Sequence, residues 1–176
     1  RMCGLSFRHV KSVFEPLKYE LAAARINERQ MVGIAMRKLK SDCDQGEVRQ
    51  LWWKVFKQNA KTNHKIMKIM SKLKRNGYKL ALLSNAGGYS HIRVCKKSWF
   101  KYMDKIIFST PIGMAKPEKR IYVYMLKKLK AKPYECVFVD DLKKNVDAAK
   151  KLGIIAVHFR NAAQVRSDLM KLGAKL

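Results

Sequence analysis

The hydrophobic and polar positions divide the chain into two parts with different patterns. Residues 12–76 are rich in Leu, Ala, Met, Lys and Arg and contain glycine only at positions 33 and 46, so we expect them to be mostly helical. From residue 79 onward, short apolar runs alternate with longer polar segments. The runs that are short enough for buried strands are Lys79–Ser84, Lys105–Ser109, Cys136–Asp140 and Ile154–Phe159. The helices expected between and after these runs cover residues 89–98, 117–130, 143–152 and 162–172.

This alternation predicts the fold class. Strands that alternate with helices at this spacing indicate βαβ units and a parallel sheet, and therefore an α/β fold. Gly77 and Gly153 each follow basic residues and come just before a predicted strand, which is typical of the end of a helix.

Composition narrows the class of protein. With 176 residues, 48% of them hydrophobic, the chain can bury the core of one domain with a small insertion. No apolar run approaches 18 residues, so we expect a soluble protein without a membrane span or an intact secretory signal. The four cysteines show no C-x-x-C spacing, which favours free thiols in a reducing compartment over a zinc site.

Polar residues follow the predicted strands at their carboxyl ends, where open α/β sheets bind ligands. Ser84 and Asn85 begin a glycine-rich turn, whose hydroxyl and backbone amides can hold a phosphoryl or carboxylate oxygen. Asp140 and Asp141 are adjacent carboxylates of the kind that bind Mg²⁺. Between them, the ammonium of Lys116 can neutralise charge that develops on a transferring phosphoryl group.

Each of these features also has an ordinary structural explanation. A Ser-Asn pair after a strand is usually a plain turn, and an Asp-Asp pair is more often the N-cap of a helix than a metal site. A single lysine carries no information in a chain with this many lysines. Their joint order and spacing are far less ordinary, and the functional interpretation rests on that order.

Three segments in this order resemble the second, third and fourth motifs of the haloacid dehalogenase (HAD) superfamily, over about residues 77–160. The segments are Ser84-Asn85, then Lys116-Pro117-Glu118 with Ile121-Tyr122, then Val137–Asp141 with Asn145, Ala148-Ala149 and Gly153. The resemblance implies a phosphatase-type protein with a Rossmann-like parallel sheet flanked by helices and a small helical cap. The cap would cover residues 12–60 and the α/β core residues 61–176.

The resemblance also implies roles for individual residues. Ser84, Asn85 and Lys116 would bind the phosphate, and Lys116 would also steady the nucleophile. Asp140 and Asp141 would hold Mg²⁺ if the site is active, and no other cofactor is expected.

The first motif of the family, a D-x-D at the end of the first core strand, has no clear counterpart. In the family its first Asp attacks phosphorus and its second is the general acid. Residues 1–11 are the candidate remnant of that strand, with Ser6 and Arg8 at the two Asp positions. Such a site would be inactive, because Ser6 has no adjacent base and an arginine cannot give up a proton near neutral pH. The alternative is a first strand that lies upstream of Arg1.

Charge is the other outstanding feature. The chain carries 39 Lys and Arg against 13 Asp and Glu, a net charge of +26, and no acidic residue lies between Glu47 and Asp104. At this charge we expect binding to the phosphates of RNA rather than to bases, although a solvated lysine-rich surface is the competing explanation. The residues proposed to bind nucleic acid are Lys57, Lys61, Lys65, Lys68, Lys72, Lys74, Arg75, Lys96, Lys97 and Lys101.

Two functional hypotheses follow. The first is a HAD-like pseudoenzyme that serves as a basic structural component of a ribonucleoprotein particle such as an organellar ribosome. It predicts RNA and neighbouring proteins as partners, no membrane contact, and a location in the mitochondrial or another organellar matrix, or otherwise the cytoplasm. The alternative is an active Mg²⁺-dependent HAD phosphohydrolase of a small phosphate ester, whose nucleophile strand lies upstream of Arg1.

Overall fold

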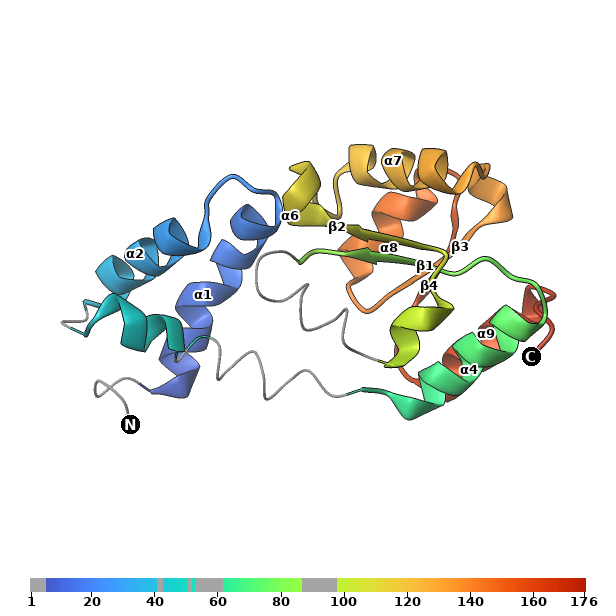
Figure 1. The fold of residues 1–176 in the computed structure, drawn as a ribbon, viewed down its shortest axis with the longest axis horizontal. Helices are drawn as coiled ribbons and strands as arrows, with labels where there is room; N and C mark the ends of the chain where they lie inside the picture. The colour runs from blue at the N-terminus through green and yellow to red at the C-terminus, as the bar shows by residue number, and fades with distance from the viewer. Residues whose placement is uncertain (1–5, 41–42, 51, 53–61, 87–97) are drawn as a thin grey trace.

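The computed structural model describes residues 6–40, 43–50, 52, 62–86 and 98–176 (Figure 1). The first helices are α1 (Phe7–Ala22) and α2 (Glu28–Leu39), followed by helical residues at 45–50 and then α4 (His64–Arg75). The remaining elements are β1 (Ala81–Ser84), the 3-10 helix η1 (Ser98–Tyr102), β2 (Lys105–Phe108), α6 (Ser109–Ile112), α7 (Lys119–Leu129), the 3-10 helix η2 (Pro133–Glu135), β3 (Val137–Asp140), α8 (Lys143–Lys150), β4 (Ile155–His158) and α9 (Ala162–Lys171). This order confirms the predicted α/β alternation after residue 79. Most of the helix expected over 89–98 lies outside the described residues.

The described strands form two parallel pairs. β1 pairs with β2 in the register Ala81↔Lys105, and β3 pairs with β4 in the register Val137↔Ile155. Among the described residues, each of the four strands therefore has a partner on one edge only. The prediction of parallel strands is confirmed, but these residues do not form one continuous sheet.

Residues 6–11 are not a strand, which corrects the expectation for the N-terminal segment. Ser6 is the N-cap of α1, where its Oγ accepts a hydrogen bond from the backbone N–H of His9 at 3.3 Å. Arg8 lies in the first turn of the same helix and is exposed. Ser6 and Arg8 therefore do not occupy the end of a core strand, and residues 1–5 lie outside the described residues.

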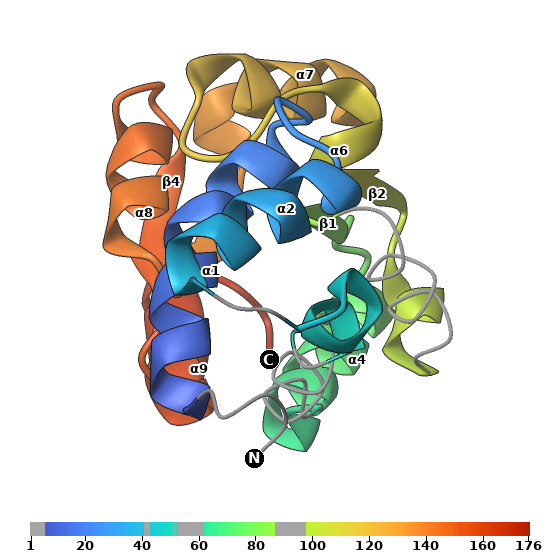
Figure 2. The same ribbon diagram turned by 90° about the vertical axis from the view of Figure 1, so that its left-hand side faces the viewer.

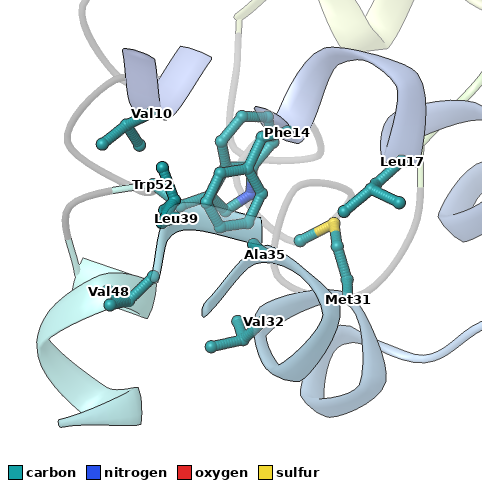
Figure 3. Packing of buried hydrophobic residues seen from close by; sticks show 9 residues of the cluster. All are labelled: Val10, Phe14, Leu17, Met31, Val32, Ala35, Leu39, Val48 and Trp52. Carbon is teal, nitrogen blue, oxygen red and sulfur yellow. The ribbon is translucent and has the colours of Figure 1, made fainter. Parts of the chain in front are cut away.

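The N-terminal helices have a hydrophobic core of their own. Figure 2 shows α1 and α2 side by side at one end of the molecule, in front of the strands. Phe14 and Trp52 stack at the centre of this core, with ring centroids 4.7 Å apart (Figure 3). The other buried members are Val10, Leu17, Met31, Val32, Ala35, Leu39 and Val48. We call α1, α2 and residues 45–50 the cap helices.

Cysteine chemistry differs from the expectation of four free thiols. Cys43, which packs against the core of the cap helices, is disulfide-bonded. Cys136 is a free thiol, and burial, with a smaller effect of Glu135, raises its pKa above the usual value. Cys3 and Cys95 lie outside the described residues.

A second core joins the two strand pairs. Ile121 and Tyr122 of α7 and Ala149 of α8 are buried in it, and Leu83 of β1 and Phe138 of β3 pack against them. This cluster places the carboxyl ends of β1 and β3 close to each other.

No helix among the described residues is long and apolar enough to span a membrane.

The glycines expected to end helices have the backbone that this role needs. Gly77 and Gly153 have φ angles of +80° and +78°. Glycine adopts this left-handed region without the steric cost that a Cβ would add, so both predicted helix ends are confirmed.

Replacing Phe14 by Ala should lower the free energy of unfolding of the cap helices by about 3–5 kcal/mol, because it removes a fully buried ring that stacks on Trp52. Urea denaturation followed by circular dichroism and tryptophan fluorescence measures the change. Lys11→Ala, an exposed position of the same helix, is the control and should change stability by less than about 0.5 kcal/mol. Equal effects of the two substitutions would contradict the described packing.

Candidate active site

A buried ion pair lies at the carboxyl ends of β1 and β3. The Nζ of Lys116 donates to Oδ2 of Asp140 at 2.6 Å, and the two side chains are 10% and 5% exposed. The same Nζ lies 5.5 Å from the centroid of the Phe138 ring. A buried charge is costly unless it is paired, and here each of the two groups provides the counter-charge of the other.

The second oxygen of Asp140 is also engaged. Its Oδ1 accepts hydrogen bonds from the backbone N–H of Leu142 at 2.9 Å and from Nδ2 of Asn145 at 2.8 Å. Asn145 is only 2% exposed and sits in the first helical turn after β3. The Asp140 carboxylate is therefore fixed in orientation by three donors.

Tyr122 supports this arrangement from behind. Its hydroxyl donates to the backbone carbonyl of Asn145 at 2.9 Å. Burial, and then the nearby Asp140 carboxylate, raise the pKa of Tyr122 well above its usual value, so the phenol stays protonated and remains a donor. The side-chain Oδ1 of Asn145 is buried without a hydrogen-bond partner among the described residues.

Asn85 links the end of β1 to Lys116. Its Nδ2 donates to the backbone carbonyl of Lys116 at 2.7 Å, and its Oδ1 accepts from the backbone N–H of Lys116 at 2.8 Å. The peptide bond between Lys116 and Pro117 is cis. The structure therefore brings together three of the predicted residues, Asn85, Lys116 and Asp140.

The other two predicted residues lie beside this cluster at the same strand ends. Ser84 is the last residue of β1, and its hydroxyl has no hydrogen-bond partner in the described part of the chain. Asp141 follows β3 and is exposed; its backbone carbonyl contacts Nε2 of His158 at 2.9 Å. Within the described part of the chain, the side-chain polar groups of Ser84 and Asp141 therefore have no partner, whereas those of Asn85 and Asp140 are hydrogen-bonded.

Comparison with known proteins shows the family to which the chain belongs. The family model of the haloacid dehalogenase-like hydrolases matches residues 8–153. The chain belongs to this family. The residues whose order resembles the HAD motifs, Ser84-Asn85, Lys116 and Asp140-Asp141, lie within the matched range.

Curated relatives match different lengths of this HAD chain. Bifunctional epoxide hydrolase 2 from Mus musculus is 39% identical over 72 residues, which are 41% of this chain and 13% of that protein. The chain thus spans only a small part of the length of that relative. D-ribitol-5-phosphate phosphatase from Bacteroides thetaiotaomicron is 27% identical over 168 residues, 92% of this chain and 78% of the relative.

A solved structure shares the fold. It is a HAD family enzyme from Bacteroides thetaiotaomicron in complex with magnesium and inorganic phosphate, and it matches with a TM-score of 0.66 at 20% identity. The match covers 88% of this chain and 84% of that one. At this identity the likeness shows the fold, and the residues of the HAD site must be argued from this chain.

The cap helices touch the HAD core beside Lys116. The hydroxyl of Tyr19, near the end of α1, donates to Oε1 of Glu118 at 2.9 Å. Arg25 lies 5.1 Å from the centroid of the Tyr19 ring and 3.5 Å from Glu118, and Arg120 also pairs with Glu118. Ala22 and Ala23 are buried against Ala115, the residue before Lys116. The position of the cap helices is therefore coupled to the loop that carries Lys116.

Glu118 is the centre of this contact. Burial acts to raise the pKa of its carboxyl, but the hydrogen bonds from Arg120 and Tyr19 and the nearby arginine charges outweigh burial and lower the pKa below its usual value. Glu118 is therefore a stable anion at neutral pH, which suits its role as the acceptor that anchors α1.

Sequence reasoning missed some of these residues. Asn145 was part of the motif resemblance without an assigned role, although its place five residues after Asp140, in a helix that follows the strand, orients it toward the strand end. The Tyr19 to Glu118 contact joins residues 99 positions apart, and nothing in the local pattern indicates it.

The predicted nucleic-acid residues are divided by the structure. Lys65, Lys68, Lys72 and Arg75 are exposed on α4, and Lys101 is exposed in η1. Lys74 instead forms an ion pair with Asp104. Lys57, Lys61, Lys96 and Lys97 lie outside the described residues.

Replacing Asp140 by Asn should lower the free energy of unfolding by about 3–5 kcal/mol, because it leaves the buried Lys116 ammonium without its counter-charge. Guanidinium denaturation at neutral pH measures the change. Asp141→Asn removes an adjacent but exposed carboxylate and should cost less than about 0.5 kcal/mol. The buried pair would be ruled out if both substitutions had the same small effect.

The Tyr19 to Glu118 contact should give a coupling free energy of about 1.5 kcal/mol in a double-mutant cycle of Tyr19→Phe and Glu118→Gln, since the acceptor is charged and partly buried. Chemical denaturation of the four proteins measures it. The matched control is a cycle of Glu15→Gln and Lys18→Met, an exposed pair within α1, with an expected coupling of about 0.4 kcal/mol. Equal couplings would mean that α1 is not anchored at Glu118.

Proposed function

We propose that this chain is a Mg²⁺-dependent phosphohydrolase of the HAD type that acts on a small phosphate ester. The observation that carries the proposal is the buried pair of Lys116 and Asp140, held by Asn85 and Asn145 where β1 and β3 end. Such a group is costly for a scaffold to keep, because an apolar pair of similar volume is often as stable. The buried Lys116 and Asp140 pair is explained if Lys116 holds a fixed cation for an anionic ligand.

The relatives support this proposal over the inactive ribonucleoprotein component. D-ribitol-5-phosphate phosphatase, which this chain covers over 78% of its length, is named for hydrolysis of a small phosphate ester. The matching family is one of hydrolases. None of these findings supports a role in a ribosome or another particle, and they favour the phosphohydrolase over the pseudoenzyme. Location in an organelle or the cytoplasm stays a prediction.

Lys116 and the end of β1 would bind the phosphoryl group. The ammonium of Lys116 faces the strand ends, and there it would neutralise charge on the phosphoryl oxygens during transfer. The Ser84 hydroxyl is free to donate to another of these oxygens. Asn85 is expected to act mainly as a positioning residue, since its amide group is bound to the backbone of Lys116.

Asp140 and Asp141 would provide part of a magnesium site. Carboxylate oxygens are the ligands that Mg²⁺ prefers, and the Asp141 carboxylate has no partner among the described residues. The described part of the chain contains no group of three or more acidic, His or Cys side chains that could hold a metal. A magnesium ion would therefore need further oxygen ligands from outside the described residues. When bound, the cation would neutralise charge on the phosphoryl group and orient it.

The remaining ligands and the nucleophile are proposed to come from a strand between β1 and β3. Neither strand is paired on its second edge in the described residues, yet Leu83 of β1 and Phe138 of β3 pack in one core. One more parallel strand at this position would join the pairs into a single sheet. A carboxylate at its end would lie beside Lys116, Ser84 and Asp140. We propose that this strand lies upstream of Arg1 and carries the nucleophile.

The protein extended at its N-terminus by the proposed nucleophile strand should hydrolyse p-nitrophenyl phosphate in the presence of Mg²⁺ and lose this activity with EDTA. Lys116→Arg should lower kcat/KM by about 10²–10³-fold, because it keeps the buried charge but moves the donors. Lys119→Arg, an exposed lysine at the start of α7, is the matched control and should leave the activity unchanged. An extended protein that is folded and binds Mg²⁺ but turns over no phosphate ester would contradict the proposal and restore the inactive scaffold.

A further inference from the structure

The orientation of α4 is fixed by its packing against α9. Ile69 of α4 is buried against Val165 and Leu169 of α9, and Ile66 and Leu73 join the same cluster. Because these residues recur at helical spacing, the opposite side of α4 must face solvent. The residues on that side are Lys65, Lys68, Lys72 and Arg75, which are all exposed, and we call them the α4 stripe.

The α4 stripe has no anionic partner among the described residues. None of its members takes part in an ion pair there, in contrast to Lys74 on the flank of the helix, which pairs with Asp104. Asp104 also accepts the backbone N–H of Leu80 at 2.8 Å, and these bonds lower the pKa of its carboxyl below the usual value. Asp168 of α9 is held by Gln164. The acidic groups of the neighbouring elements are therefore already engaged.

The spacing of the α4 stripe matches a phosphate backbone. At about 1.5 Å per residue, the ten residue steps from Lys65 to Arg75 extend over about 15 Å. One strand of a duplex carries one charge per about 3.4 Å of axis, so about four phosphates of one backbone fall within that length. The surrounding chain, from residue 48 to 103, contains no acidic residue that would repel them.

We infer that the α4 stripe binds the phosphate backbone of a nucleic acid. This goes beyond the hydrolysis of a small ester and does not depend on it. The stripe is a straight row of cations on a helix whose other side is buried, so it contacts phosphates and shape rather than base edges. The charge of the whole chain strengthens the encounter, and the stripe fixes where the backbone lies.

The test compares two variants that remove the same number of charges. In the first, Lys65, Lys68, Lys72 and Arg75 are each replaced by Gln. In the matched control, Lys127, Lys128, Lys150 and Lys151 are replaced by Gln; these are exposed lysines on α7 and α8 or just after it. Binding of labelled 20-base-pair RNA and DNA duplexes to the full chain is measured by fluorescence polarisation between 50 and 300 mM salt. In this range counterion release makes affinity fall with salt, with a slope of about 0.9 per phosphate contact.

The stripe variant should reduce the slope of log affinity against log salt by about 3 to 4, and the control variant by less than about 1. The RNA and DNA arms show which nucleic acid binds more tightly. Circular dichroism measures whether both variants are folded. If the quadruple variant is unfolded, the single variant Lys68→Gln replaces it and should lower the slope by about 1.

Three outcomes would overturn the inference. Equal slopes for the stripe and control variants would mean diffuse charge without a binding surface. If neither duplex bound at about 150 mM salt, nucleic acid would not be the ligand of the α4 stripe. Tighter binding to vesicles with 30% phosphatidylserine than to either duplex would assign the stripe to a lipid surface instead.

Discussion

The ion pair between Lys116 and Asp140 connects the two strand pairs of this protein. Asp140 ends one strand pair, and Lys116 is tied through Asn85 to the end of the other. Buried charges of this kind contribute little to net stability, because the loss of hydration offsets most of their attraction. Their effect is on geometry: an ammonium and a carboxylate are held in fixed positions, by bonds from Asn145 and the Leu142 backbone, where a phosphoryl group would bind. The same loop carries Glu118, which accepts the hydrogen bond from Tyr19 of the cap helices.

The sequence predicted the strands and the site because both leave local signals. Four short apolar runs predicted all four described strands. Polar residues at strand ends predicted Asn85 and Asp140, and Lys116 was singled out from its place between them; the structure brings the three together. Parallel strands place their carboxyl ends on one edge of a sheet, so order along the chain is enough to predict proximity.

Other features could not be predicted because they depend on neighbours in space. An apolar run shows that a strand forms but not which strand pairs with it, and the division into two pairs was therefore unexpected. Ser6 was expected in a core strand, but a serine before a helical run is equally a good N-cap, and the structure shows that role. The anchoring of α1 by Glu118 depends on a contact between distant parts of the chain.

The most direct test of this account is a crystal structure of the protein together with the proposed nucleophile strand, grown with Mg²⁺ and a phosphate analogue. The account predicts a parallel strand between β1 and β3, with a carboxylate at its end facing the analogue, and Lys116 and Asp140 still paired behind it. A structure in which β1 and β3 pair directly with each other, or in which Lys116 points away from the bound analogue, would contradict the account.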